Sequence, residues 1–165
     1  MRTNILKSGR SAIAAIGFAV AMTYSSMSAF AEAPLYERIG GYKAVAAAVD
    51  HLVDNIYKNQ TLNKNPTLKA VHDLDERAAF KLVLATWVME NTGGPKIYFG
   101  RPMDKAHLPL NITNREFNVI LHECLETFYQ LGVGQKEIDE LMAGLEAQRE
   151  AVVTAEAPIK PVAAK

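Results

Sequence analysis

The side chains of this chain best suited to metal or redox chemistry are a single cysteine and four histidines. Cys124 has no second cysteine to pair with, so the sequence excludes an internal disulfide, a CxxC metal site and a CxxCH attachment motif. Any cofactor must therefore be held without a thioether bond. Among the histidines, His107 is of most interest. It lies in a segment whose residue composition is not explained by packing alone.

This segment, residues 91–110, contains three glycines and three prolines. A loop of this length inside a compact domain is usually functional or disordered, and its apolar side chains argue against disorder. Pro102 suits the first turn of a short helix that carries Met103 and His107, and Pro109 would end that helix. Taken in isolation, His107 would most simply be a partly buried surface histidine.

Helical periodicity runs through most of residues 34–153, and no segment shows sustained period-two alternation, so an all-α fold is predicted. A capping box from Thr113 to Glu116 marks the clearest helix start, and Gly132 marks the end of that helix. The predicted core-facing stripes are Val45, Val49, Leu52, Val53 and Ile56; Phe80, Val83, Leu84, Trp87 and Val88; Phe117, Ile120, Leu121, Cys124, Leu125 and Phe128; and Ile138, Leu141, Met142 and Leu145.

The two ends of the chain differ from this helical region. Residues 1–31 have a basic start, an apolar run over 12–22 and an Ala29-Phe30-Ala31 cleavage pattern, as in a secretory signal peptide. The apolar run is shorter than a membrane span needs, so we expect cleavage, no stable membrane span afterwards, and a periplasmic or secreted protein. Residues 154–165 contain two prolines and no periodicity, which predicts a flexible tail.

The charge balance limits the classes of partner. The full chain has 18 basic and 18 acidic residues, and the three basic residues of the 1–31 segment would be lost on cleavage. The remainder would carry a net charge of about −3, whereas a nucleic-acid binder would show a basic face. No nucleic-acid partner is therefore expected.

Several motifs occur in a characteristic order over about residues 35–153. They are Leu-Tyr-Glu-Arg-Ile-Gly-Gly at 35–41, Gly-Gly-Pro at 93–95, Tyr98-x-Gly100-Arg101-x-Met103 followed by His107, and Ile112-Thr113 followed by Phe117. In their order and spacing these motifs resemble the truncated haemoglobins, most closely their group I. The resemblance implies a two-over-two helical sandwich with a shortened first helix, in a domain spanning 34–153.

By this resemblance His107 is the proximal axial ligand of a b-type haem. One neutral imidazole leaves the sixth position of haem iron open to O₂, NO or CO. Lys81, Arg101 and Lys105 are candidates to hold the haem propionates at the rim. Taken alone, each wall candidate would more simply be an ordinary core residue, and each rim candidate a solvated surface charge. The candidate apolar walls are Val53, Phe80, Leu84, Trp87, Tyr98, Met103, Phe117 and Ile120.

The chain departs from the family on the distal side of the haem. Many group I members hydrogen-bond the gas ligand through a tyrosine and a glutamine, whose positions fall here on Val53 and near Leu84. Losing a hydrogen bond to a charged group costs about 1.5–3 kcal/mol, which would weaken O₂ binding by roughly ten- to a hundredfold. Extra residues between 61 and 75 leave Tyr57 and His72 as candidate distal groups, with His72 either a sixth iron ligand or a surface and capping residue.

The implied function is reversible binding of a diatomic gas. One alternative is a haem-dependent NO dioxygenase or peroxidase, which would need an external reductase because the chain has no flavin or nicotinamide motif. Another is a haem-free helical interaction module that has lost its cofactor.

Overall fold

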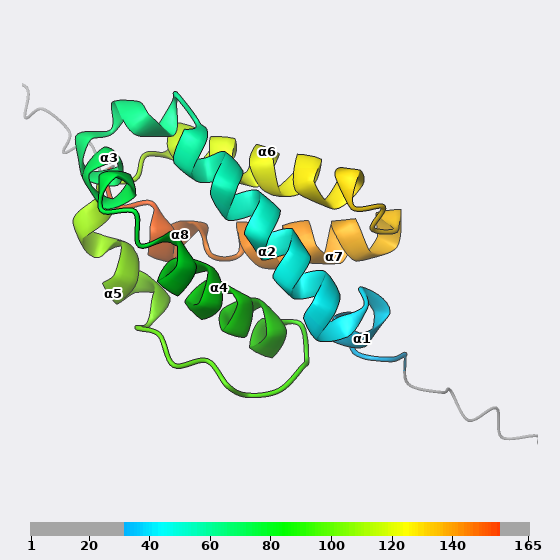
Figure 1. The fold of residues 1–165 in the computed structure, drawn as a ribbon. Helices are drawn as coiled ribbons and strands as arrows, with labels where there is room; N and C mark the ends of the chain where they lie inside the picture. The colour runs from blue at the N-terminus through cyan, green and yellow to red at the C-terminus, as the bar shows by residue number, and fades with distance from the viewer. Residues whose placement is uncertain (1–31, 156–165) are drawn as a thin grey trace, which may run out of the picture. The chain divides into compact units, whose positions relative to one another are not determined.

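The computed structural model of the chain describes residues 32–155, and the described part is mainly helical (Figure 1). The predicted signal peptide, residues 1–31, and residues 156–165 of the predicted tail lie outside the described residues. No strand occurs within residues 32–155, which confirms the all-α class. The helices are α1 Leu35–Arg38, α2 Gly41–Lys58, η1 Leu62–Lys64, α3 Pro66–Asp73, α4 Arg77–Asn91, α5 Met103–His107, η2 Leu108–Leu110, α6 Asn114–Gln130, α7 Gln135–Glu146 and α8 Arg149–Val152.

Local sequence signals account for the ends of α6. The Thr113 hydroxyl accepts a hydrogen bond from the backbone N–H of Glu116 at 3.2 Å, and the Glu116 carboxylate accepts one from the Thr113 N–H at 2.8 Å. This is the predicted capping box, and it satisfies backbone donors that the first helical turn leaves unpaired. At the other end, Gly132 adopts a left-handed conformation with φ of 70°, as helix-terminating glycines often do.

The long helices form two packed pairs, α2 with α4 and α6 with α7, and α2 also packs against α6 (Figure 1). This is the predicted two-over-two arrangement, and the first helix, α1, is short as expected. Three apolar clusters hold it together. The first comprises Val45, Val49, Val53, Ala85 and Met89; the second Leu52, Cys124, Phe128, Ile138 and Leu141; and the third Leu62, Leu68, Ile112, Phe117 and Val152.

Helix α4 buries a different face from the one that its periodicity predicts. Its deepest residues are Ala85, Thr86 and Met89, and Ala85 and Met89 belong to the first cluster, against α2. The predicted stripe is only partly covered, and Phe80 at its start is 40% exposed. Because α2 takes the neighbouring face, Leu84 and Trp87 are left to line a cavity, whereas Phe80 and Leu82 are exposed.

Two glycines offer a matched test of these packing relations. A Cβ built on Gly144, inside α7, meets no atom within 4 Å, whereas one built on Gly94 would lie 2.7 Å from the Tyr36 ring and 2.8 Å from the Met89 carbonyl oxygen. Gly144→Ala should therefore raise the free energy of unfolding by about 0.5–1 kcal/mol, because alanine favours a helix interior. Gly94→Ala should lower it. Urea denaturation of both variants measures the two changes, and destabilisation by Gly144→Ala would contradict the packing described.

Candidate functional site

His107 is the last residue of α5, and its ring is fixed by the turn that carries it. The Nδ1 atom lies 2.8 Å from the backbone carbonyl oxygen of Met103. A carbonyl oxygen can only accept, so Nδ1 carries the proton and the neutral ring keeps a lone pair on Nε2. Burial lowers the pKa of His107 below its ordinary value, which favours that neutral form. The imidazole is thus prepared as a metal ligand through Nε2.

The loop before α5 holds this short helix in place. The Tyr98 hydroxyl donates to the carbonyl oxygen of Arg101 at 2.6 Å, and the Tyr98 backbone N–H donates to the Glu90 carboxylate of α4 at 3.0 Å. A Cβ on Gly100 would overlap the Tyr98 phenol, so this position requires glycine. Tyr98 was predicted as a wall residue. In the structure its hydroxyl makes a hydrogen bond within the loop, and its backbone N–H joins the loop to α4.

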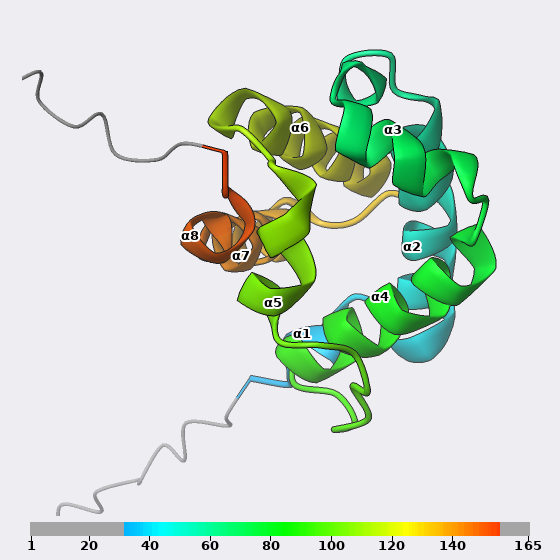
Figure 2. The ribbon, with the colours of Figure 1, turned by 90° about the vertical axis from the view of Figure 1, so that its left-hand side faces the viewer.

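The other end of α5 continues into η2 and is covered by the C-terminal segment. Helix α8 packs against α5, and the Thr154 hydroxyl donates to the His107 carbonyl oxygen at 3.4 Å. In Figure 2, α5, α7 and α8 lie on one side of the interior, with α2 and α3 on the other. The short helix that carries His107 therefore faces the interior of the sandwich from the side opposite α2.

The predicted wall residues fall into separate groups. Val53 is fully buried in the first cluster and Phe117 is buried in the third, where the Arg149 guanidinium lies 4.5 Å from the centre of its ring. Met103 and Ile120 are half-buried beside that third cluster. The remaining three, Phe80, Leu84 and Trp87, follow the incompletely covered side of α4.

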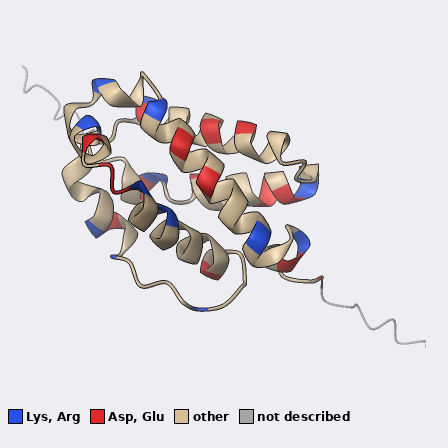
Figure 3. Cartoon of the chain, viewed as in Figure 1, with Lys and Arg blue, Asp and Glu red and all other residues tan. Residues whose placement is uncertain are grey.

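The three candidate rim cations have different surroundings, and Lys105 pairs with its neighbour Asp104 at 3.3 Å. Lys81 lies 2.7 Å from Asp50 and 2.8 Å from Asp54, and these carboxylates raise the pKa of its ammonium group. Figure 3 shows the acidic residues of α2 beside the basic residues at the start of α4. A propionate would have to compete with these two acids for Lys81, whereas Arg101 is exposed on the loop before α5.

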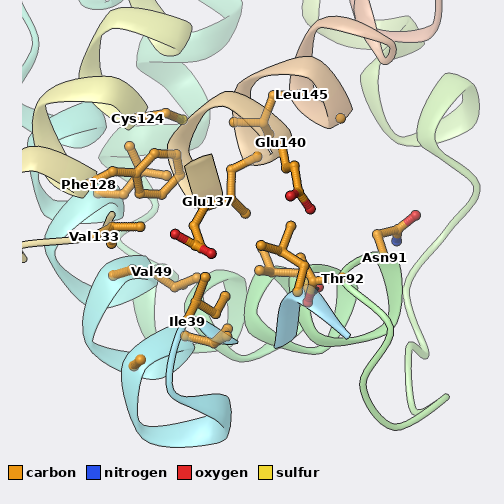
Figure 4. A pocket seen from close by; sticks show the side chains of 18 of the residues that line it. Ile39, Val49, Asn91, Thr92, Cys124, Phe128, Val133, Glu137, Glu140 and Leu145 are labelled. Carbon is orange, nitrogen blue, oxygen red and sulfur yellow. Dashed lines mark hydrogen bonds between the residues drawn. The ribbon is translucent and has the colours of Figure 1, made fainter. Parts of the chain in front are cut away.

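A cavity with a volume of about 580 Å³ lies among α1, α2, α4, α6 and α7 (Figure 4). Its walls are mainly apolar, and they include Leu84 and Trp87 but none of the other ten predicted site residues. Sequence periodicity did not reveal this space. The signal that could have pointed to it is a set of small residues, Ala44, Ala47, Ala48 and Gly144, on helices that otherwise carry large apolar side chains.

A group of charged side chains lies on one side of this cavity, where the carboxylates of Glu137 and Glu140 can be seen in Figure 4. The Arg38 guanidinium donates to Glu137 at 3.1 Å, contacts Glu140 at 2.5 Å and donates to the carbonyl oxygen of Ala33 at 3.1 Å. Glu32 pairs with Arg38 at 3.6 Å and also with Lys136. These bonds join the start of the described chain and α1 to α7.

The arrangement suits a flat apolar group that is anchored by one axial ligand. It provides a neutral imidazole with a free Nε2 atom, and large apolar side chains on α4 that the protein itself leaves partly exposed. Apolar surface that stays uncovered inside a fold is unfavourable unless a ligand covers it. The residues present therefore fit a haem, with His107 as the candidate ligand of its iron.

Comparison with known proteins identifies the class. Residues 34–154 match the family of bacterial-like globins, and the chain belongs to that family. It is 28% identical to a group 1 truncated haemoglobin of Tetrahymena pyriformis over 124 residues, 70% of this chain and 90% of that protein. It is 34% identical to a group 1 truncated haemoglobin of Nostoc commune over 99 residues, 60% of this chain and 79% of that protein.

The fold is also similar to a solved structure, that of the 2/2 haemoglobin of Synechococcus sp. PCC 7002 in the cyanomet state with covalently attached haem. The TM-score is 0.66 at 26% sequence identity, and the match covers 73% of this chain and 98% of that chain. The chain is thus a truncated globin with group 1 relatives, and this family implies a haem cofactor.

The one cysteine of the chain is predicted to be unreactive in the folded protein. Cys124 is 2% exposed and lies beside the cavity, and burial raises the pKa of its thiol from about 9 to about 12. Since the thiolate is the reactive form, the folded protein should react with a thiol reagent at pH 8 about a thousandfold more slowly than the unfolded chain. Colour release from an aromatic disulfide reagent, with and without urea, measures both rates.

A matched control places the thiol on the exposed face of the same helix. The double variant Cys124→Ser and His122→Cys should react quickly without urea, because position 122 is exposed. Equal rates for native wild type and this variant would show that Cys124 is accessible.

Proposed function

We propose that this protein is a haem-binding globin that reversibly binds a diatomic gas at a b-type haem held by His107. The observation that carries the proposal is the hydrogen bond from Nδ1 of His107 to the Met103 carbonyl oxygen, which leaves Nε2 free. A haem iron with one axial imidazole keeps a sixth position for O₂, NO or CO. The protein's own contribution is to orient the imidazole, keep it neutral and exclude water.

The apolar side chains around the interior would contribute to this function by contacting the two faces of the haem. Leu84, Trp87 and Phe80 on α4 would cover one face of the porphyrin, and Met103, Phe117 and Ile120 lie on the side of α5 and α6. Covering these surfaces favours haem binding through the hydrophobic effect. Arg101, being exposed and near α5 in sequence, is the better-placed rim cation for a propionate.

The two positions expected to contact the gas are apolar, and this bears on which gas is held. Val53 is fully buried among aliphatic side chains, so it offers no hydrogen bond. We infer that O₂ is held less tightly than in relatives with polar residues at these positions, whereas CO and NO depend less on such a bond. Gas sensing or transient handling of NO fits this site better than O₂ storage.

The function depends on cofactor capture, so replacing the axial histidine is the first test. His107→Ala should reduce haem bound after reconstitution at least tenfold, because the iron loses its protein ligand. Added haem should raise the melting temperature of wild type and leave that of the variant nearly unchanged, since a ligand that binds only the folded state stabilises it. Visible absorption and thermal melts provide the two measurements.

His122→Ala is the matched control, because His122 is exposed on α6 and should leave haem binding intact. If wild type binds no haem while remaining folded, the proposal fails and the haem-free interaction module is favoured. If His107→Ala retains haem with an unchanged spectrum, another residue is the ligand.

We also propose that the protein acts outside the cytoplasm, after removal of residues 1–31. The support is the basic start, apolar run and Ala29-Phe30-Ala31 pattern in the sequence. Among residues 32–155, no helix is long and apolar enough to cross a membrane.

Export can be tested on the intact gene product. Mass spectrometry of protein from the periplasmic fraction of a bacterial host should give a chain that begins at Glu32. Ala31→Arg should leave an uncleaved precursor, because the peptidase requires a small residue there. A wild-type chain that keeps residues 1–31 in the cytoplasmic fraction would contradict the proposal.

A further inference from the structure

The loop between α4 and α5 carries large apolar side chains on the outside of the protein. Ile97 is 49% exposed and Phe99 is 62% exposed, although side chains of these types are usually buried. The loop passes outside α4 on its way to α5, as Figure 1 and Figure 2 both show. Neither of the two cavities lined by α2 and α4 includes a residue of this loop. Residues 95–101, here called the tip loop, thus present apolar side chains to the outside.

The tip loop is held in a fixed shape by its own hydrogen bonds. The Tyr98 hydroxyl donates to the Arg101 carbonyl oxygen at 2.6 Å, which closes the chain around Phe99. The Tyr98 N–H donates to the Glu90 carboxylate at 3.0 Å and joins the loop to α4. Because this backbone is already fixed, contact with a partner would cost little additional conformational entropy.

The charges around the tip loop are positive. Lys96 and Arg101 lie on either side of Phe99, both are exposed, and neither forms an ion pair with another residue of 32–155. Residues 92–102 contain no acidic residue, and Figure 3 shows basic residues along this stretch. The whole chain has 18 basic and 18 acidic residues, so this excess of positive charge is local.

A second exposed apolar surface, on α2 and α4, differs in its charges. Tyr42 is 63% exposed and Leu82 is 58% exposed, and both line a shallow groove with Lys81. Lys81 is held by Asp50 at 2.7 Å and Asp54 at 2.8 Å. The tip loop, by contrast, combines exposed apolar side chains with cations that are free to bind an anion outside the protein.

This combination fits the surface of an anionic lipid bilayer. Aliphatic and aromatic side chains gain free energy when they enter the apolar boundary beneath the lipid headgroups, and lysine and arginine are attracted to anionic lipids. A protein partner would need a hollow matched to the exposed tip, whereas mobile headgroups can rearrange around it. The exposed side chains and the free cations therefore favour a lipid surface over a protein.

We propose that the tip loop docks the protein on an anionic lipid bilayer. Ile97 and Phe99 insert between the headgroups, and Lys96 binds lipid phosphate, since no other role has been assigned to this cation. Docking of this kind requires neither haem nor a membrane-spanning segment. In a chain that binds gas as proposed above, it would also place the gas site beside lipid, in which diatomic gases dissolve better than in water.

Binding to lipid vesicles tests the docking directly. The chain that begins at Glu32 contains the whole described fold, and it is used with and without haem. Wild type should sediment with vesicles of mixed phosphatidylglycerol and phosphatidylcholine but not with vesicles of phosphatidylcholine alone. Raising NaCl from about 0.05 to about 0.5 M should weaken this binding, because salt screens the charges.

Substitutions separate the apolar part of the docking from the ionic part. Ile97→Ser combined with Phe99→Ser should lower the affinity for the mixed vesicles about tenfold or more, because the inserted apolar surface is lost. Lys96→Ala should lower it about fivefold, and Lys96→Arg should keep it. None of these three residues is a candidate haem contact, so haem binding should stay unchanged in each variant.

Tyr42→Ser combined with Leu82→Ser is the matched control. It removes two side chains of similar exposure from α2 and α4 and should leave vesicle binding unchanged. Circular dichroism of each variant checks that the helices have formed. An equal loss of binding in this control would show general apolar adhesion and would overturn the role of the tip loop.

The remaining outcomes also decide the matter. Unchanged vesicle binding after loss of Ile97 and Phe99 would overturn docking through the tip loop. Vesicle binding that disappears when haem is added would show that these side chains belong to the cofactor site. A wild type that binds polyglutamate but no vesicles would point to an acidic protein partner in place of a bilayer. Haem binding is measured separately, so either proposal can fail while the other stands.

Discussion

Helix α2 is the constraint on which the rest of this structure depends, because it is shared by two apolar clusters. Val49 and Val53 pack against α4, while Leu52, on an adjacent part of the same helix, packs against α6 and α7. With Ala85 and Met89 of α4 packed against α2, Leu84 and Trp87 are left to line the cavity. The way in which α2 packs against both neighbours thus decides which apolar side chains of α4 stay available to contact a cofactor.

Signals that act within one helical turn could be predicted from the sequence. The capping box at Thr113 and the proline before α5 both mark helix starts at the expected places, since a cap or a fixed φ needs only local atoms. Helix α3 has an equally local signal that was not singled out: Asn65 accepts from the N–H groups of Thr67 and Leu68, with Pro66 at the first helical position.

What could not be predicted depends on contacts between helices. Periodicity identified Leu84 and Trp87 as apolar positions but could not show that the neighbouring face of α4 would be the deeper one. The carboxylates that hold Lys81 lie about 30 residues earlier in the chain, so no local pattern links them to it. The hydrogen bond in which the Asn63 amide oxygen accepts from Nδ1 of His72 likewise joins η1 to α3, and the cavity is a space rather than a residue pattern.

The ion pairs of Arg38 have a consequence for how the protein is made. Glu32 and Ala33, the first two residues after the proposed cleavage site, are already tied to Arg38, and Glu32 is tied also to Lys136 of α7. A peptidase binds its substrate in an extended conformation. A segment that is held by these ion pairs cannot enter the active site of the peptidase. If residues 1–31 are removed as proposed, cleavage would therefore have to precede the formation of these ion pairs.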